Sequence, residues 1–284
     1  LRHSHSANRW NTRWGCSSGF SSLSSSNVAQ RYYNLLCSSH IICCGIGIVH
    51  MKKHYHFIGI GGTGLAPMAR ILLEQGNVVS GSDIFISPLA EELRRKGAIV
   101  YLGHKGEQVA GADIVIRSSA IQEDNPEIQG AKSCGIPILR RADFLHELTF
   151  HNIVIAIAGT HGKTTTTAMT AWVLEEAGID PSYIIGGTSK NLMSNAHAGK
   201  GAHFVIEADE YDSMFLGLSP SYLILTIVEY DHPDCYPTQD AYLDAFKKLI
   251  MKMENNAILL VNADHKQTRD IGKWAEQYRK VLYY

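Results

Sequence analysis

The sequence predicts an α/β protein with two consecutive units, each built on a parallel sheet. In both units an apolar strand runs into a glycine-containing turn and then a helix, at "HYHFIGIGGTGLAPM" and again at "NIVIAIAGTHGKTTT". Strands without polar alternation, such as "NIVIAIAG" and "YLILTIV", are typical of parallel sheets that are buried on both faces. We therefore expect a Rossmann-like domain over residues 51–148 and a P-loop-type α/β domain over residues 149–284.

The charge and the cysteines limit the classes of partner. The chain of 284 residues has a net charge of −1, so no bulk field attracts nucleic acid or an anionic membrane. After residue 50 the chain has only Cys134 and Cys235, without metal-ligand spacing, which is typical of a reducing cytoplasm. We expect a cytoplasmic protein that binds phosphorylated ligands through local groups such as helix N-termini and single lysines.

Residues 1–50 differ in composition from the rest of the chain. They are rich in Ser and Cys, and their apolar run "HIICCGIGIV" is too short to span a bilayer. Met51 directly precedes the first strand pattern, as a start codon would. We interpret residues 1–50 as a non-native or disordered extension, with a transit peptide or signal sequence as the alternative, and exclude them from the fold.

The first unit begins with a strand, a glycine turn, a helix and a second strand between residues 54 and 81. Gly59, Gly61 and Gly64 fit the pattern GxGxxG, and Asp83 follows at a spacing that reaches a ribose hydroxyl. Taken alone, this pattern indicates a nicotinamide dinucleotide. The same turn binds any diphosphate, because its backbone N–H groups and the helix dipole attract the anion. The alternative without a ligand is tight packing of the strand against the helix.

A later strand of this unit, "ADIVIRSSAI", ends at Ser118 and Ser119. Open α/β sheets bind ligands at the carboxyl ends of their strands, so these serines are candidate ligand contacts. The alternative is that they cap the next helix. Further strands are expected at residues 99–101 and in "GIPILRR", before a helix that leads out of the unit.

The second unit contains a short phosphate loop. The standard pattern is GxxxxGK[ST], but here the nearest glycine upstream of Gly162 is Gly159. A strand precedes the loop and a helix follows it, which is the context that phosphate binding requires. Lys163 would reach the β- and γ-phosphates of a nucleotide, and Thr164 would bind Mg²⁺. The alternative is a chance Gly-Lys-Thr at the start of a helix.

Carboxylates and a histidine follow two further strands of the second unit. They are Glu207, Asp209, Glu210 and Asp212 after "HFVI", and Glu229, Asp231 and His232 after "YLILTIV". If the sheet is parallel, these side chains lie at the same edge as the phosphate loop, where a carboxylate and a histidine complete a magnesium site around ATP. The alternatives are a solvated loop charge for Glu207 and a core histidine for His232.

The order of these motifs resembles that of the Mur ligases of peptidoglycan synthesis. The matching motifs are "GIGGTG", "SGSD", "SSAI" followed by "NPE", "RRADFL", "AGTHGKTTT", "EADEYD" and "VEYDHPD". The resemblance covers residues 54–265, and "GTHGKTT" is the short phosphate loop of that family. Leu65-Ala66-Pro67 after the glycine turn favours the members that use L-alanine, because members that add a recycled tripeptide usually have Phe-Met there.

The resemblance implies ATP-dependent ligation of L-alanine to UDP-N-acetylmuramate through an acyl phosphate, in the bacterial cytoplasm, with ATP and Mg²⁺ as cofactors. The first domain would then bind the UDP end of the substrate, and no nicotinamide is implied. The alternatives are a tripeptide-adding ligase and a non-catalytic UDP-sugar-binding fragment.

The resemblance also implies the residues of the site. The substrate contacts are Gly59, Gly61, Gly62, Thr63, Gly64, Asp83, Ser118 and Ser119. The ATP-binding loop is Gly159, Thr160, His161, Gly162, Lys163, Thr164 and Thr165. The catalytic residues are Lys163, Glu207 and His232, and the metal ligands are Thr164 and Glu207 for one magnesium ion and His232 for a second.

The sequence departs from the family pattern in two respects. Ile227 stands where the family often has Asn. Family members are also longer and end in a third domain that helps to bind the amino acid and closes over ATP. We therefore expect the chain to be C-terminally truncated and to bind its ligands without ligating them. We also expect the strand "AILLV" to lie at or near a ragged sheet edge, with fewer partners than the intact domain provides.

Overall fold

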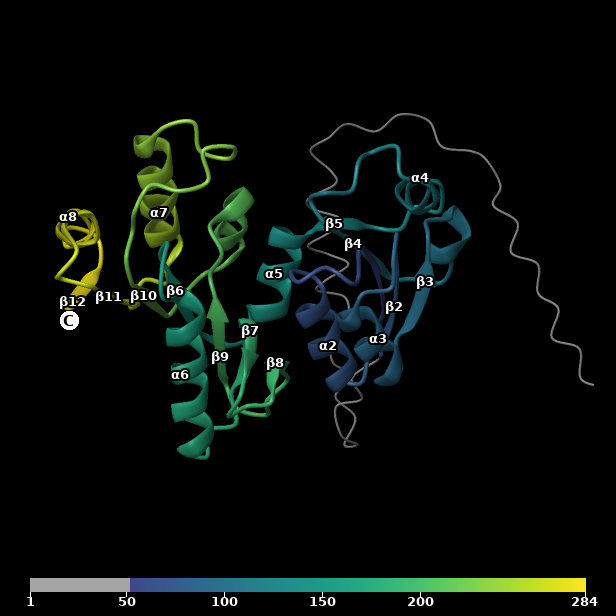
Figure 1. The fold of residues 1–284 in the computed structure, drawn as a ribbon, viewed down its shortest axis with the longest axis horizontal. Helices are drawn as coiled ribbons and strands as arrows, with labels where there is room; N and C mark the ends of the chain where they lie inside the picture. The colour runs from purple at the N-terminus through teal and green to yellow at the C-terminus, as the bar shows by residue number, and fades with distance from the viewer. Residues whose placement is uncertain (1–51) are drawn as a thin grey trace, which may run out of the picture. The chain divides into compact units, whose positions relative to one another are not determined.

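The computed structural model describes residues 52–284. The extension predicted at residues 1–50 lies outside the described residues. Residues 52–284 form two sheets, one of five and one of seven strands, with helices in the connections between strands (Figure 1). No helix within this range is long and apolar enough to cross a membrane. The predicted α/β fold class is confirmed.

The five-stranded sheet is parallel throughout, in the order β3-β2-β1-β4-β5. Its strands are β1 His54–Ile58, β2 Val78–Asp83, β3 Ile99–Leu102, β4 Ile114–Arg117 and β5 Ile138–Arg140. The chain builds outward from β1 to β3 and then returns to the other side of β1 with β4. Ligands of doubly wound sheets bind at the carboxyl ends of the strands where the order reverses. The glycine turn after β1 and Ser118 after β4 both lie at this point.

The helices of this sheet are α2 Ala66–Glu74, α3 Pro88–Arg95, the short 3₁₀ helix η1 Gly106–Val109, α4 Pro126–Ser133 and α5 Arg141–Thr149. Two of them begin with Pro at the first position and a capping side chain before it. Ser87 Oγ accepts the backbone N–H of Ala90 at 3.1 Å, and Asn125 Oδ1 accepts that of Glu127 at 2.9 Å. The cap of α4 is therefore Asn125, and Ser118 does not serve this purpose.

The seven-stranded sheet has the order β12-β11-β10-β6-β9-β7-β8, visible in Figure 1. Its strands are β6 Ile153–Ala158, β7 Ser182–Ser189, β8 Ser194–His197, β9 His203–Glu207, β10 Tyr222–Leu225, β11 Ile258–Val261 and β12 Lys280–Tyr283. Only the β7–β8 pair is antiparallel within the described sheet. Since β10, β6 and β9 are adjacent and parallel, the loops that follow them lie at one edge of the sheet.

The strand predicted to lie at or near a ragged sheet edge is β11. It lies one strand from the edge and pairs in parallel with β10 on one side and β12 on the other. Strand β12, which sequence reasoning did not identify, covers its outer side. The helices of this sheet are α6 Lys163–Glu176, the 3₁₀ segment η2 Tyr211–Gly217, α7 Gln239–Lys252 and α8 Lys266–Ala275.

Candidate functional site

The phosphate loop after β6 has the backbone shape that its glycines permit. Gly159 and Gly162 have φ values of +133° and +82°, which residues with a side chain rarely adopt. A Cβ atom on Gly159 would lie 2.3 Å from Thr226 Oγ1 and 2.8 Å from the carbonyl oxygen of Ile227. Helix α6 begins at Lys163 with Gly162 as its N-cap, so the N–H groups of its first turn point out of the helix at the loop. This arrangement suits an anion.

The segment that follows β10 contacts the backbone of the phosphate loop. Thr226 Oγ1 lies 2.6 Å from the carbonyl oxygen of His161 and 3.1 Å from that of Ala158. The carbonyl oxygen of Ile227 accepts the N–H of Thr160, so Ile227 contributes through its backbone. An Asn at that position is therefore not needed for this contact. Sequence reasoning missed Thr226; the only local sign of it is a hydroxyl in the otherwise apolar "YLILTIV".

The side chains of Thr160 and His161 contribute to the shape of the loop. Thr160 Oγ1 donates to the carbonyl oxygen of Glu229 at 2.7 Å, accepts the N–H of Glu229 at 2.9 Å and lies 2.9 Å from Tyr242 Oη. His161 Nε2 lies 3.3 Å from the Glu229 carboxylate. These contacts connect the loop after β6 to the loop after β10. The loop is therefore held in its shape by side chains that lie far away in the sequence.

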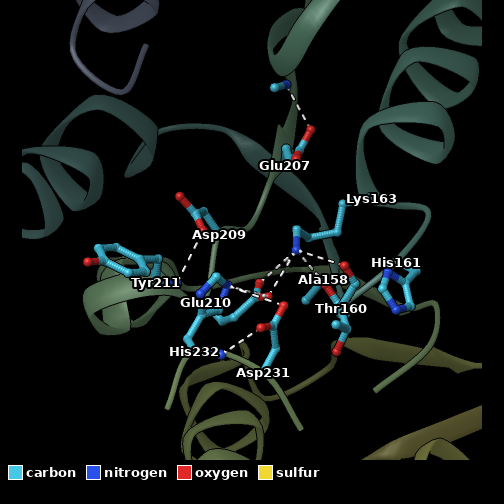
Figure 2. A network of polar contacts seen from close by, with 12 residues as sticks. Ala158, Thr160, His161, Lys163, Glu207, Asp209, Glu210, Tyr211, Asp231 and His232 are labelled. Atoms are coloured by element: carbon cyan, nitrogen blue, oxygen red, sulfur yellow. Dashed lines mark hydrogen bonds and ion pairs between the residues drawn. The ribbon is translucent and has the colours of Figure 1, made fainter. Parts of the chain in front are cut away.

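Lys163 is paired with a buried carboxylate in this structure (Figure 2). Its Nζ atom donates to the two carboxylate oxygens of Glu210 at 3.0 and 2.9 Å, and to the carbonyl oxygen of Gly159 at 2.7 Å. The side chain of Glu210 is fully buried and also accepts the hydroxyl of Tyr242 at 3.3 Å. Burial raises the pKa of Tyr242, which keeps this hydroxyl protonated as a donor. A pattern of four acidic residues could not single out Glu210 as the partner of Lys163.

Thr164 and Glu207 form a second polar contact at the same edge. Thr164 Oγ1 donates to Glu207 Oε1 at 3.1 Å, and Glu207 Oε2 accepts the N–H of Gly186 at 2.7 Å. A Cβ atom on Gly186 would lie 2.6 Å from both carboxylate oxygens, so this glycine leaves the room that the carboxylate occupies. A hydroxyl and a carboxylate are hard oxygen ligands, and Mg²⁺ commonly takes one or two carboxylates with substrate phosphates and water. The donor set fits magnesium.

His232 lies with Glu210 and Asp231, apart from Glu207 (Figure 2). Its Nε2 atom is 3.6 Å from Glu210 Oε1 and 3.8 Å from Asp231 Oδ2, and its backbone has a φ of +55°. No group of three or more metal-ligating side chains occurs within residues 52–284. The predicted metal ligands thus fall into two groups, Thr164 with Glu207 and His232 apart from them.

The glycine turn after β1 is closed by the end of β2. The N–H groups of Gly59 and Ile60 donate to the carbonyl oxygen of Ser82 at 2.8 and 3.1 Å. The N–H of Gly61 donates to Asp83 Oδ2 at 2.9 Å, while Asp83 Oδ1 accepts the N–H of the following residue at 2.8 Å. The carboxylate predicted to reach a ribose therefore also orders the turn.

The two serines after β4 lie at the same turn but differ in exposure. A Cβ atom on Gly59 would lie 3.2 Å from the Cβ of Ser118, so this serine is adjacent to the turn. Ser118 also donates its N–H to the carbonyl oxygen of Ile58 at 3.1 Å. Ser119 is exposed. Gly62 and Thr63, at the tip of the turn, are exposed as well.

Two protein-family models match this chain, one over each of its two sheets. The model of the Mur ligase family catalytic domain matches residues 54–152, and that of the Mur ligase middle domain matches residues 157–284. A UDP-N-acetylmuramate–L-alanine ligase of Roseiflexus sp. (strain RS-1) is 45% identical over 212 residues, which are 74% of this chain and 45% of that protein. The chain spans about half the length of the curated relatives it matches.

Solved structures resemble the described fold. One is the UDP-N-acetylmuramate:L-alanyl-γ-D-glutamyl-meso-diaminopimelate ligase from Neisseria meningitides, with a TM-score of 0.74 and 30% identity, covering 82% of this chain and 78% of that one. Another is the UDP-N-acetylmuramate–alanine ligase from Thermotoga maritima, with a TM-score of 0.70 and 33% identity, covering 78% of this chain and 51% of that one. With both domain models matched and most of the Neisseria chain covered, the chain belongs to the Mur ligase family.

Proposed function

We propose that this chain carries the nucleotide-sugar and ATP sites of a ligase that joins L-alanine to UDP-N-acetylmuramate. The observation that carries the proposal is the grouping of Lys163, Thr164 and Glu207 at one sheet edge, in a chain 45% identical to a ligase named for that reaction. The product is a peptidoglycan precursor, and the proposed location is the bacterial cytoplasm.

ATP is proposed to bind at the phosphate loop between Gly159 and Thr165. The loop offers the N–H groups of the first turn of α6 and the ammonium of Lys163. Thr164 and Glu207 would bind one magnesium ion, and His232 a second. Such ions supply further neutralisation of the phosphate charge.

UDP-N-acetylmuramate is proposed to bind at the five-stranded sheet. Its diphosphate would lie at the glycine turn, and Asp83 and Ser118 would contact the rest of the nucleotide sugar. The position of these residues where the strand order reverses supports this. The proposal excludes the nicotinamide dinucleotide that GxGxxG alone indicated.

The reaction has two steps. The muramate carboxylate attacks the γ-phosphorus of ATP, the bond to the β-γ bridging oxygen breaks, and an acyl phosphate and ADP form. The amine of L-alanine, which loses a proton to solvent, then attacks the acyl carbon; inorganic phosphate leaves and the amide forms. Both partners of the first step are anions, so alignment and charge neutralisation are the main requirements. Lys163 meets them by exchanging contacts with Glu210 for contacts with the transferring phosphoryl group.

A second candidate is the ligase that adds a tripeptide to the same nucleotide sugar. The similarity to the Neisseria structure, whose name specifies that tripeptide, favours it. The stretch Leu65-Ala66-Pro67 after the glycine turn favours L-alanine. The two candidates share the described sites and differ in the amine donor.

Calorimetry on the chain tests the proposed sites. We expect saturable binding of UDP-N-acetylmuramate and of MgATP, and weaker binding of NAD. Tighter binding of NAD than of the UDP-sugar would contradict the proposal. In a full-length version of the protein, phosphate release that depends on L-alanine, measured against release that depends on the tripeptide, separates the two amine donors.

A further inference from the structure

Arg141 is a partly buried cation, with 28% of its side chain exposed, whose hydrogen-bonding capacity is not fully used within the described residues. It is the first residue of α5, and its Nε atom is buried without a hydrogen-bond partner. Its ion pair with Asp209 is long, with 3.9 Å between Nη1 and Oδ2. Burial lowers the pKa of Arg141, although Asp209 and Asp212 oppose the shift. A guanidinium has five N–H donors, and a buried donor without an acceptor is unfavourable, so this side chain has unused capacity to bind an anion.

The guanidinium lies directly against the glycine turn. A Cβ atom on Gly64 would lie 2.4 Å from Nη1 and 2.5 Å from Cζ of Arg141. Gly64 does not have the left-handed φ that requires glycine elsewhere in the chain. The third glycine of GxGxxG is therefore explained by the space that Arg141 occupies.

The turn also has backbone donors without acceptors. The N–H groups of Gly59, Ile60 and Gly61 donate to the end of β2, but those of Thr63 and Gly64 have no acceptor within residues 52–284. They stand just before α2, whose N-terminus carries a partial positive charge. Free N–H groups and an under-used guanidinium thus lie at the same glycine.

We propose that Arg141 binds the diphosphate of the nucleotide sugar, together with the N–H groups of Thr63 and Gly64. This inference rests on the proposed function, because it takes the ligand of the turn to be a nucleoside diphosphate sugar. The planar fork of a guanidinium matches two phosphate oxygens, and a diphosphate offers acceptors to the Nε atom that Asp209 does not reach. Arg141 lies 58 residues after Asp83, the last residue of the glycine-turn motif.

The test measures affinities by isothermal titration calorimetry on the whole chain. The ligands are uridine, UDP, UDP-N-acetylglucosamine and UDP-N-acetylmuramate, with uridine measured by competition. The variants are Arg141→Gln, Arg141→Lys and the control Arg140→Gln. Arg140 is a matched control because it is the preceding arginine and its side chain is exposed.

We expect Arg141→Gln to weaken UDP and both UDP-sugars by the same factor, about ten- to a hundredfold. Uridine binding stays unchanged, since uridine has no phosphate. Arg141→Lys causes a smaller loss, because an ammonium keeps the charge without the fork, and it replaces Arg141→Gln if that variant does not fold. Arg140→Gln leaves all four affinities unchanged.

Three outcomes overturn the proposal. An equal loss of uridine binding means that Arg141 only supports the fold. A loss confined to UDP-N-acetylmuramate means that Arg141 binds the muramyl carboxylate and not the diphosphate. Unchanged UDP affinity means that Arg141 does not contact the ligand. If the wild-type chain binds none of the UDP ligands, the proposed function itself fails, which is a different result from failure of the Arg141 variants.

Discussion

The two glycine-containing loops share a strand–turn–helix architecture but differ in how their positive charge is held. In the phosphate loop the cation is Lys163, at the start of the helix, and the buried carboxylate of Glu210 compensates it at 2.9 Å. At the glycine turn the cation is Arg141, which comes from another helix; within residues 52–284 its one ion pair is with the carboxylate of Asp209, at 3.9 Å. An anion at the phosphate loop must therefore compete with Glu210, whereas an anion at the glycine turn meets a cation that lacks a close partner.

The strongest way to break this comparison is Lys163→Ala. Removing one member of a buried ion pair leaves Glu210 uncompensated, so the free energy of unfolding falls by about 3–5 kcal/mol in urea denaturation. MgATP affinity falls by about ten- to a hundredfold, while UDP affinity is unchanged because Lys163 belongs to the other loop. The double variant with Glu210→Gln recovers most of the stability but not the ATP binding. An equal loss of UDP binding would refute the assignment of two separate sites.

Gly159→Ala tests whether the phosphate loop depends on its backbone shape. An alanine at this position would have to adopt a φ of +133°, and its Cβ would lie 2.3 Å from Thr226 Oγ1. We expect a loss of about 2–4 kcal/mol in the free energy of unfolding, with weaker ATP binding. The control is Gly178→Ala, which has a φ of +73° but no atom within 4 Å of the added Cβ, and costs about 1 kcal/mol. Equal effects of the two variants would rule out crowding by Thr226.

Gly64→Ala tests whether the glycine turn depends on the position of the Arg141 guanidinium. The added Cβ displaces the guanidinium of Arg141, the mobile end of a long side chain, so stability changes by less than about 1 kcal/mol. If Arg141 binds the diphosphate, UDP affinity falls by about tenfold while ATP affinity stays the same. Gly178→Ala is the control, because Gly178 lies outside the predicted substrate contacts and no atom is within 4 Å of the added Cβ. Unaltered UDP binding in Gly64→Ala would speak against a role for Arg141.

The smallest expected effect is that of replacing Glu147, a carboxylate on α5, the helix that also carries Arg141. Its partner Lys53 is 4.0 Å away. Burial raises its pKa above the ordinary 4.5, and the attraction of Lys53 only partly opposes this. Because the pKa of Glu147 is raised in the folded state, this group contributes stability that is fully present below pH 4.5. That contribution is lost as the pH rises through the pKa of the folded state. Glu147→Gln therefore stabilises the protein at pH 7, by less than about 1 kcal/mol, and the gain disappears in acid. Urea denaturation at pH 7 and at a pH below 4.5 measures the difference in the free energy of unfolding between the variant and the wild type. A stabilisation by Glu147→Gln that persists below pH 4.5 would contradict the explanation.

Much of the fold was predictable because its determinants are local. The apolar run Ile153–Ala158 has no polar alternation, and it is a central strand of a parallel sheet. Gly178, with a φ of +73°, follows the end of α6, where glycine commonly terminates a helix. The outer strand β12 was not predicted, since "KVLY" is short and its burial depends on β11.

The site was predictable in its residue types but not in its pairings. Sequence reasoning placed Lys163, Glu207 and Glu210 at one edge, because parallel strands end together. It could not decide that Glu210 contacts Lys163 while Glu207 contacts Thr164. The loop after β9 has non-helical turns at Asp212 and Ser213, and such turns depend on packing more than on residue type.

By itself, the sequence determined the α/β class, the two glycine-containing loops and the family, because these depend on residue spacing along the chain. Only the tertiary structure decided which charges meet. Lys163 and Glu210 are 47 residues apart, and Thr226 reaches the carbonyl of His161 across 65 residues. The contact between Arg141 and Gly64 likewise joins distant segments. Such contacts depend on strand order and on the direction of each side chain, and a difference of one residue in a loop would aim a side chain elsewhere.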